Sequence, residues 1–459
     1  MKNFSNKKNI ILFLAVLISF LTIKVAKATP PTTLYHDPAI FHDIYGHIPY
    51  INHDKTEGKK RQFCSLDLEP FYEHASGAKN SNGHKVPCGD INGRWNMIGL
   101  LQGQEASPNG TLNDGSHTYM LDAYNNIEHG RVSSTNYLSN TFTDTNGTFG
   151  YFSIPINHEK FGLRTKFQLK FNSIALTVRT GVINYKQNPT FNDMTPSATD
   201  YGFNPYDIVL TDTYLMIEQR RTHIFNEIGL DVNKVNKTTM EDTHIELSWN
   251  KSFGMDNEDG VLTVAFQPFL AAGIWLPSGV KKNQDAAMSI PTGNNGFIGY
   301  TIEGALNFDF PGTIMISVGG SATFFGHKTV NNYRLPSNDG QSGIYPWKTT
   351  VRLGQGTVWR FQTGFISRHF LENLSMGFGY IFTKKEQDSI LIKDTSTRTA
   401  YFKTGKAEKE SGWESQMFHF GADYDITREL ALGAAIETPI TGKRILRTLT
   451  LMGDVRFSF

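Results

Sequence analysis

The stretch FGLRTKFQLKF, residues 161–171, alternates between apolar and polar side chains at almost every position. Phe161, Leu163 and Phe167 share one parity, and Arg164 and Lys166 share the other. Because successive residues of a β-strand point to opposite faces, the pattern predicts a strand with one apolar face and one cationic face. At ~3.3 Å per residue and a tilt of ~45°, the strand is roughly 25 Å tall, which matches the apolar core of a membrane.

The same alternation recurs along the chain in segments longer than the usual strands of soluble sheets, which have about five or six residues. Short turns alternate with long polar stretches at 276–296, 326–347 and 383–412. Two further segments, near 61–73 and 91–102, would raise the number of strands from twelve to fourteen. The twelve are predicted near residues 149–156, 161–171, 174–186, 242–253, 261–275, 297–309, 313–325, 356–369, 374–382, 413–425, 429–439 and 445–459.

A soluble β-sandwich would also alternate, with its apolar face as the core. The long strands and the alternation of short and long connections favour an all-β protein of another kind: a closed antiparallel transmembrane β-barrel of about 12–14 strands. Trp249, Trp359 and Tyr380 lie near predicted strand ends, where interfacial aromatic residues are expected. The stretch 187–241 contains a segment with helical character, which we expect to fold over or into the barrel.

The first 28 residues have the layout of a secretory signal peptide, with a basic start, an apolar run and small residues at Ala26 and Ala28. A retained anchor is the alternative, although the run is shorter than the ~20 residues that a spanning helix needs. We expect a signal peptide at 1–28, a periplasmic or lumen-plugging segment at 29–60 and the barrel at 61–459. Because five lysines and no acid lie in 1–28, the net charge falls from +1 to −4, and nucleic acid is not an expected partner.

Two cysteines, Cys64 and Cys88, either form one disulfide, which export permits, or remain as two thiols. A cluster of four histidines near the N-terminus offers ligands that suit zinc or copper, but its spacing matches no compact metal site, so no metal or other cofactor is expected. These histidines are His36, His42, His47 and His53.

Two histidine–carboxylate pairs share strand faces: His419 with Asp423, and His244 with Glu246. Hydrolytic enzymes need a nucleophile or an activated water beside such a pair. Because no serine elbow accompanies either pair, we predict that the protein is not an enzyme.

The last strand ends in DVRFSF, with Val455, Phe457 and Phe459 on one parity. This ending resembles the C-terminal signature of Gram-negative outer-membrane β-barrel proteins, which the assembly machinery of that membrane reads. The resemblance implies an outer-membrane location, with that machinery, the lipid bilayer and lipopolysaccharide as partners. It also implies that the last strand pairs with the first to close the sheet.

The polar parity of the strands predicts a charged lumen, and we interpret the protein as a porin-like pore for small polar solutes. One alternative is a plugged transporter of hydrophobic molecules, similar to fatty-acid transporters, and another is a non-conducting structural or adhesion protein. Opposite charges that only neutralise one another in a packed interior would fit the non-conducting structural or adhesion protein. The predicted pore-lining residues are Arg164, Lys166, Lys170, Arg179, Glu303, Arg360, Arg368 and Asp423.

Overall fold

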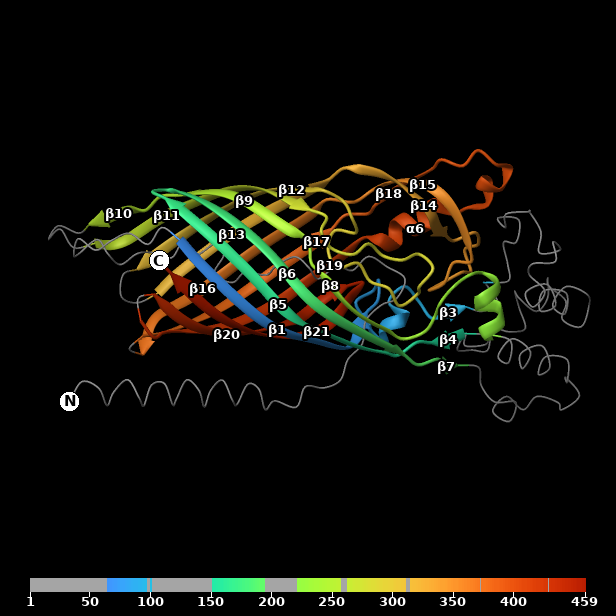
Figure 1. Cartoon of the computed structure of the whole chain (residues 1–459), viewed down its shortest axis with the longest axis horizontal. Coiled ribbons are helices and arrows are strands. Elements are labelled where there is room, and N and C mark those ends of the chain that lie inside the picture. The colour runs from blue at the N-terminus through green and yellow to red at the C-terminus, as the bar shows by residue number, and fades with distance from the viewer. Residues whose placement is uncertain are drawn as a thin grey trace, which may run out of the picture.

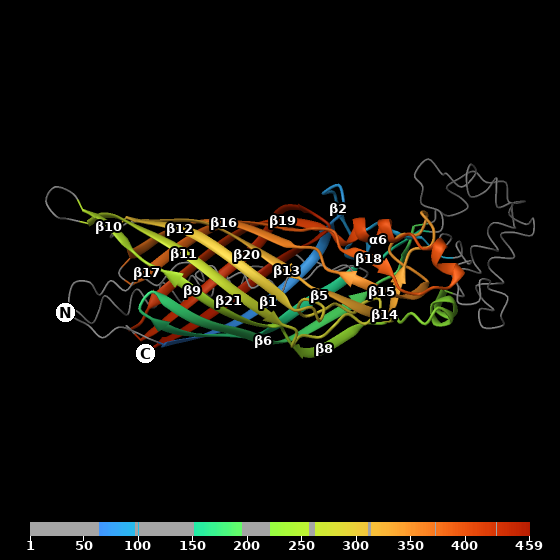
Figure 2. The ribbon, with the colours of Figure 1, turned by 90° about the horizontal axis from the view of Figure 1, so that it is seen from above.

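The computed structural model describes residues 64–96, 100, 151–194, 221–256, 262–310, 314–371, 373–427 and 429–459. The predicted signal peptide at 1–28 and the predicted plug at 29–60 lie outside these residues. Figures 1 and 2 show long tilted strands that wind around one axis, with extra elements gathered at the end away from the C-terminus.

Twelve antiparallel strands form a closed ring, so the predicted all-β barrel is confirmed. The ring closes where the last strand pairs with the first, from Ser65 opposite Ser458 to Lys79 opposite Ile445. In order around the barrel the strands are β1 (Cys64–Lys79), β5 (Ile156–Phe171), β6 (Ile174–Pro189), β9 (Thr243–Asn250), β11 (Leu262–Leu276), β12 (Gly299–Phe310), β13 (Ile314–Phe325), β16 (Val358–Leu371), β17 (Leu374–Lys385), β19 (Trp413–Asp425), β20 (Leu430–Lys443) and β21 (Ile445–Ser458).

Two predicted barrel strands are wrong. The segment 149–156 is not one barrel strand: it contains β4 (Tyr151–Ser153), which pairs with β3 (Trp95–Asn96) and β7 (Asn192–Asp193) in a separate small sheet, and its last residue, Ile156, begins β5. The segment 91–102 contributes only β3 to any sheet among the described residues. Pro155 follows β4 directly, and proline cannot donate a ladder hydrogen bond, so the alternation of 149–156 does not continue as one strand. The optional segment 61–73 instead supplies β1.

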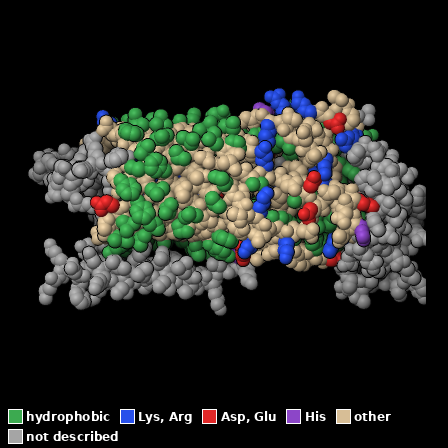
Figure 3. Space-filling view, in the orientation of Figure 1, with side chains coloured by type: hydrophobic (Ala, Val, Ile, Leu, Met, Phe, Trp, Pro, Cys, Tyr) green, Lys and Arg blue, Asp and Glu red, His purple; other side chains and the backbone are tan. Residues whose placement is uncertain are grey.

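The outer face of the barrel carries a belt of exposed apolar side chains, whereas charged side chains are buried on the inner face. Figure 3 shows this belt over the part of the barrel nearer the C-terminus, with lysine and arginine side chains at its border. Among the described residues, no helix is both long and apolar enough to cross a membrane. Exposed members of the belt include Phe161, Leu163, Phe167, Leu247, Leu270, Ile302, Leu306, Val318, Phe361, Phe378 and Phe418.

Beyond the belt, the connections between strands fold into a cap with its own sheet, formed by β14 (His327–Leu335), β15 (Trp347–Gly354) and β18 (Ser389–Ile392). The long polar stretches 326–347 and 383–412 therefore contain ordered structure. Other elements outside the ring are β2 (Lys85–Val86), β8 (Val235–Met240), β10 (Phe253–Asp256), the 3-10 helices η2 (Cys88–Asp90) and η5 (Thr397–Tyr401), α6 (Thr404–Ser411), and a helical segment at 221–227.

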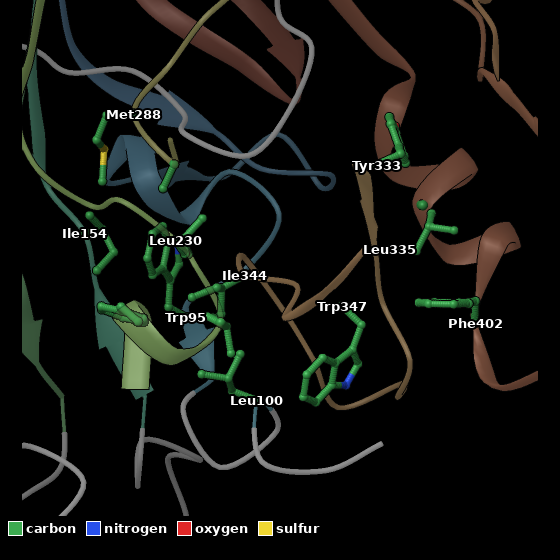
Figure 4. Close-up of a cluster of buried hydrophobic side chains, with 14 of the residues drawn as sticks. Trp95, Leu100, Ile154, Leu230, Met288, Tyr333, Leu335, Ile344, Trp347 and Phe402 are labelled. Carbon is green, nitrogen blue, oxygen red and sulfur yellow. The ribbon is translucent and has the colours of Figure 1, made fainter. Parts of the chain in front are cut away.

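A buried hydrophobic cluster holds the cap together. Figure 4 shows Trp95 beside Leu230 and Ile344, side chains that come from three distant parts of the chain. Trp95 also makes an edge-on contact with Phe225, at 6.3 Å between ring centroids. Since Ile156 at the start of β5 belongs to the same cluster, the cap and the barrel wall share one continuous apolar core.

Candidate functional site in the barrel interior

The inner faces of the twelve strands are unequal. β1 and β13 lie six places apart around the ring, as do β5 and β16, so each pair faces across the barrel. The inner faces of β21, β1 and β5, which are neighbours in the ring, carry a dense group of charged side chains, and we call them the charged wall. Across from it, the inner faces of β13, β16 and β17 carry several small residues, which we call the small-residue wall, beside larger ones such as Arg360 and Ile366. The small residues are Ser317, Gly319, Ser321, Gly364, Gly377 and Gly379.

The first charged cluster lies on the part of the charged wall nearer the C-terminus. Cross-strand register places Asp67 of β1 opposite both Lys166 of β5 and Arg456 of β21. The Lys166 ammonium is 3.0 Å from the Asp67 carboxylate, and the Arg456 guanidinium is 3.6 Å from it. Arg456 also pairs with Asp454 at 2.9 Å and approaches Asp423 at 3.8 Å. Four strands therefore contribute to one ion-pair network.

The second charged cluster lies nearer the cap. Glu73 of β1 is opposite Lys160 of β5, and its carboxylate is 3.2 Å from the ring nitrogen of His158. Glu241, from the link between β8 and β9, contacts Lys160 at 2.9 Å and Arg164 at 2.7 Å. Each of these side chains is at least nine-tenths buried. Such ions remain charged inside a protein only when partners replace their lost hydration.

Two further histidines are held by neighbours on the inner face. His419 pairs with Glu437 at 2.9 Å, through a register that sets the two residues opposite each other on β19 and β20. His244 stacks on Trp275, with 4.2 Å between ring centroids. The expected pairing of His419 with Asp423 is therefore replaced by a cross-strand pair.

The structure places seven of the eight predicted pore-lining side chains on the inner face. Arg164, Arg179, Glu303 and Asp423 are buried, and three more are half-buried, namely Lys166, Lys170 and Arg360. Arg368 lies in β16, but its side chain is outside the described part of the structure. That these residues line a conducting pore stays a prediction.

Several members of the clusters are absent from the residues predicted by sequence. The strand near 161–171 begins five residues earlier, at Ile156, so continuing its even parity backwards would have found Lys160 and His158. Asp67 and Glu73 lie in 61–73, one of the two segments beyond the twelve predicted strands. No sequence pattern predicts that the Glu241 side chain lies inside the barrel, because an irregularity between two strands directs it inward.

Of the two alternatives for Cys64 and Cys88, the structure has two free thiols rather than a disulfide. Cys64 begins β1 at the C-terminal end of the barrel, whereas Cys88 packs against Ala75 and Ala78 near the cap. From Cys64 to Ala75 the strand extends roughly 36 Å at ~3.3 Å per residue. A disulfide requires Cα atoms within about 7 Å of each other.

Several buried polar atoms on the inner face have no hydrogen-bond partner among the described residues. They include Nε2 of Gln267, Oγ1 of Thr383, Nε2 of His419 and Oδ1 of Asp454. A buried polar group without a partner costs about 1–3 kcal/mol in a dry interior, whereas water satisfies it. The polar inner face therefore favours a hydrated interior. No group of three or more His, Cys, Asp or Glu within the described part of the chain is arranged to hold a metal ion.

Ionisable groups in the cap are also perturbed. Burial lowers the pKa of Lys328 to about 8, and the nearby Lys281 adds to this shift. The Lys328 ammonium lies 4.2 Å from the centroid of the Phe297 ring and donates a hydrogen bond to the carbonyl of Asn295. Lys328 thus joins β14 to the loop between β11 and β12.

Comparison with known proteins gives a likeness to bacterial outer-membrane barrels. No family model matches the sequence, and no curated protein matches it. An outer membrane channel from Pseudomonas putida F1 is 9% identical, with a TM-score of 0.45, over 87% of this chain and 97% of that one. The β domain of the Bordetella autotransporter BrkA is 9% identical, with a TM-score of 0.32, over 86% and 100%. OprD from Pseudomonas aeruginosa is 7% identical, with a TM-score of 0.26, over 87% and 95%.

Proposed function

We propose that this protein is an outer-membrane channel for small polar solutes. One observation carries the proposal: the inner face of a closed barrel combines a charged wall with a facing wall of small residues. Small side chains take up less of the cross-section than large ones would, and the buried polar atoms without protein partners among the described residues favour water in the interior. Between eight strands, which fill with side chains, and sixteen, which leave a wide channel, twelve strands suit a narrow passage.

The apolar belt supports the location in a membrane. Its side chains are exposed at positions where a soluble protein of this size would bury them, and contiguous exposed apolar surfaces mark interaction sites. Strands can cross lipid only as a closed barrel. An exported barrel of this type belongs in the outer membrane, where we expect the assembly machinery to recognise the ending formed by Val455, Phe457 and Phe459.

Cations at the cap side of the belt support a further contact with anionic lipid. Lys186 lies on the outer face over the ring of Phe161, at 5.5 Å, and Lys237 is exposed on the neighbouring β8. Figure 3 shows basic side chains along this border. Their position suits the phosphate groups of lipopolysaccharide, because ammonium groups at a membrane surface attract anionic headgroups.

The charged wall bears on which solutes would pass. Charged side chains that line one wall of a narrow lumen attract and orient polar molecules and oppose the entry of apolar ones. A transporter of hydrophobic molecules would need an apolar inner face, whereas Lys166, Asp67 and Arg456 place ions there. A purely structural anchor requires neither a charged wall nor a facing wall of small residues. Enzymatic activity is not part of the proposal.

Conductance across a planar lipid bilayer tests the proposal. The refolded full-length protein should give stable ohmic steps, and a charge change inside the barrel should alter ion selectivity. Lys170 is half-buried on the inner face and forms no ion pair among the described residues, so Lys170→Glu should shift the reversal potential toward cation selectivity. The matched control, Lys186→Glu, makes the same charge change on the outer face, beside the exposed Phe161 ring, and should leave selectivity unchanged. Absence of conductance from a folded, inserted barrel would refute the proposal.

A further inference from the structure

An extra residue in the barrel wall directs Glu241 into the interior. β6 pairs with β8 up to Val182 opposite Met240, and with β9 from Arg179 opposite His244. Two residues of β6 thus oppose three residues of the other strand, the arrangement of a β-bulge. The backbone N–H of Glu241 donates to the carbonyl of Gly181 at 2.9 Å. Bulges re-aim side chains, and this one turns a carboxylate toward the charged wall.

Glu241 meets a guanidinium in a two-bond arrangement. Nε of Arg164 donates to Oε2 of Glu241 at 2.7 Å, and Nη2 donates to Oε1 at 2.9 Å. The ammonium of Lys160 is 2.9 Å from Oε1 as well. A planar fork with a second cation beside it is the arrangement that proteins use to recognise free carboxylates.

The two cations are held in place without help from Glu241. The Arg164 guanidinium lies over the ring of Phe71, with its Cζ 4.1 Å from the ring centroid, and the Lys160 ammonium is 5.6 Å from the same centroid. Phe71 is buried, so the cation–π contacts are shielded from water. The register also sets Glu69 opposite Arg164 and Glu73 opposite Lys160. The fork thus has supporting neighbours on β1.

Glu241 enters this site from another strand, through space that a glycine leaves. A Cβ atom at Gly181 would lie 2.6 Å from Oε2 of Glu241, so any larger residue there would displace the carboxylate. On β5 the exposed belt begins at Phe161, between Lys160 and Arg164. The site therefore lies at the cap-side edge of the belt, between the cap and the membrane-facing part of the barrel.

We propose that Arg164 and Lys160 form a binding site for the carboxylate group of a small solute, and that Glu241 occupies this site as an internal competitor. The inference deepens the proposed channel function and rests on it. A solute carboxylate displaces the Glu241 side chain, binds the fork and is released when Glu241 returns. Because Glu69 and Glu73 remain close to the two cations, the site is nearly neutral without Glu241, which favours weak, reversible binding over trapping.

Chemical rescue tests the site independently of conduction. Glu241→Ala removes the competitor and leaves the fork open. Sodium acetate should raise the unfolding temperature of this variant in detergent along a saturable curve, by ligand binding to the folded state. Sodium chloride at equal ionic strength should not, and acetate should stabilise the wild-type chain much less, because Glu241 competes for the same site. The matched control is the double variant Arg164→Met with Glu241→Ala, in which the acetate effect should disappear.

Conductance measurements distinguish the carboxylate site from the proposed channel function. Glu241→Gln keeps the size of the side chain and removes its charge, so anion over cation permeability should rise by about threefold or more, and acetate should reduce the chloride current saturably. If acetate stabilises Glu241→Ala while no variant conducts, the carboxylate site stands and the channel function fails. If the protein conducts but acetate neither stabilises Glu241→Ala nor affects Glu241→Gln, the carboxylate site is refuted. If Glu241→Ala does not fold, acetate added during refolding replaces the stability assay, and failure to restore folding refutes the site.

Discussion

Cys64 and Phe459 exchange both of their backbone hydrogen bonds, although 395 positions separate them in the chain. The Phe459 N–H donates to the Cys64 carbonyl at 2.8 Å, and the Cys64 N–H donates to the Phe459 carbonyl at 3.3 Å. This pair begins the ladder between β1 and β21, which continues toward the cap. An open sheet would leave these groups unpaired in lipid, where each costs several kcal/mol.

Closure therefore depends on an intact ladder along β21. Leu451 lies between two strands, opposite Tyr72 on β1 and Ile436 on β20. Its N–H therefore faces a partner strand on whichever side it points. Leu451→Pro removes that donor, and we expect the variant to lose the folded form in detergent micelles. Leu451→Ala keeps the donor and should retain it. The measurement is the band shift between unheated and boiled samples on a denaturing gel. A normal band shift for Leu451→Pro would contradict the requirement for an intact ladder along β21.

The stacked pair of His244 and Trp275 depends on a glycine beside it. A Cβ atom at Gly273 would overlap Nε2 of His244, which is already fixed against the Trp275 ring. We expect Gly273→Ala to destabilise the barrel by about 1–3 kcal/mol, the usual cost of overpacking. Gly304 on the next strand is the control, because a Cβ atom there would meet no atom closer than 3.6 Å. Urea unfolding from lipid vesicles compares the two variants. Equal stabilities would contradict the packing described for His244.

The cap should show a pH dependence that comes from Lys328. Its pKa in the folded protein is about 8, below the ordinary 10.5, because of burial and the nearby Lys281. Between pH 8 and 10.5 the unfolded chain holds a proton that the folded chain has released. Folding is therefore favoured increasingly as the pH rises through this range, and the penalty for the charged form is fully present below pH 8.

Lys328→Met removes this contribution. The unfolding temperature of the wild type minus that of Lys328→Met should increase from pH 7 to pH 10, whatever its value at pH 7. Lys237→Met, at an exposed position of β8, should show a difference that does not change with pH. A constant difference for Lys328→Met would mean that this lysine titrates normally in the folded protein.

The barrel can be predicted from the sequence because its outer face contacts lipid and its inner face contacts water. The alternation from Phe161 to Phe171 can be recognised without tertiary information. A one-residue shift in strand register would turn every charged side chain toward lipid, so the pattern fixes which face is which. The same alternation is sufficient to predict that Arg164 and Asp423 lie on the inner face. Pairing of the last strand with the first was also predicted, and it is confirmed.

The rest depends on contacts between distant segments, which alternation does not encode. The carboxylates on the inner face of β1, Asp67 and Glu73, made that segment a weak strand candidate, although their partners on β5 and β21 neutralise them in the fold. Glu241 reaches Arg164 only because the wall contains a bulge. The cap combines Trp95 with residues more than a hundred positions away. Of its elements, the sequence predicts the helical segment within 187–241, which the structure has at 221–227, and predicts only loops in the long polar stretches.

In a membrane-spanning barrel with a wet interior, one side of each strand faces lipid and the other faces water. Val318 and Ser321 test this on β13, because Val318 is 39% exposed on the outer belt and Ser321 lies on the small-residue wall. In a chain with Cys64→Ser and Cys88→Ala, each position is changed to cysteine and the protein is reconstituted into lipid vesicles. The measurement is the rate of labelling by a small, charged methanethiosulfonate. The account predicts that Ser321→Cys is labelled and Val318→Cys is not; labelling of Val318→Cys alone, or of neither, would contradict it.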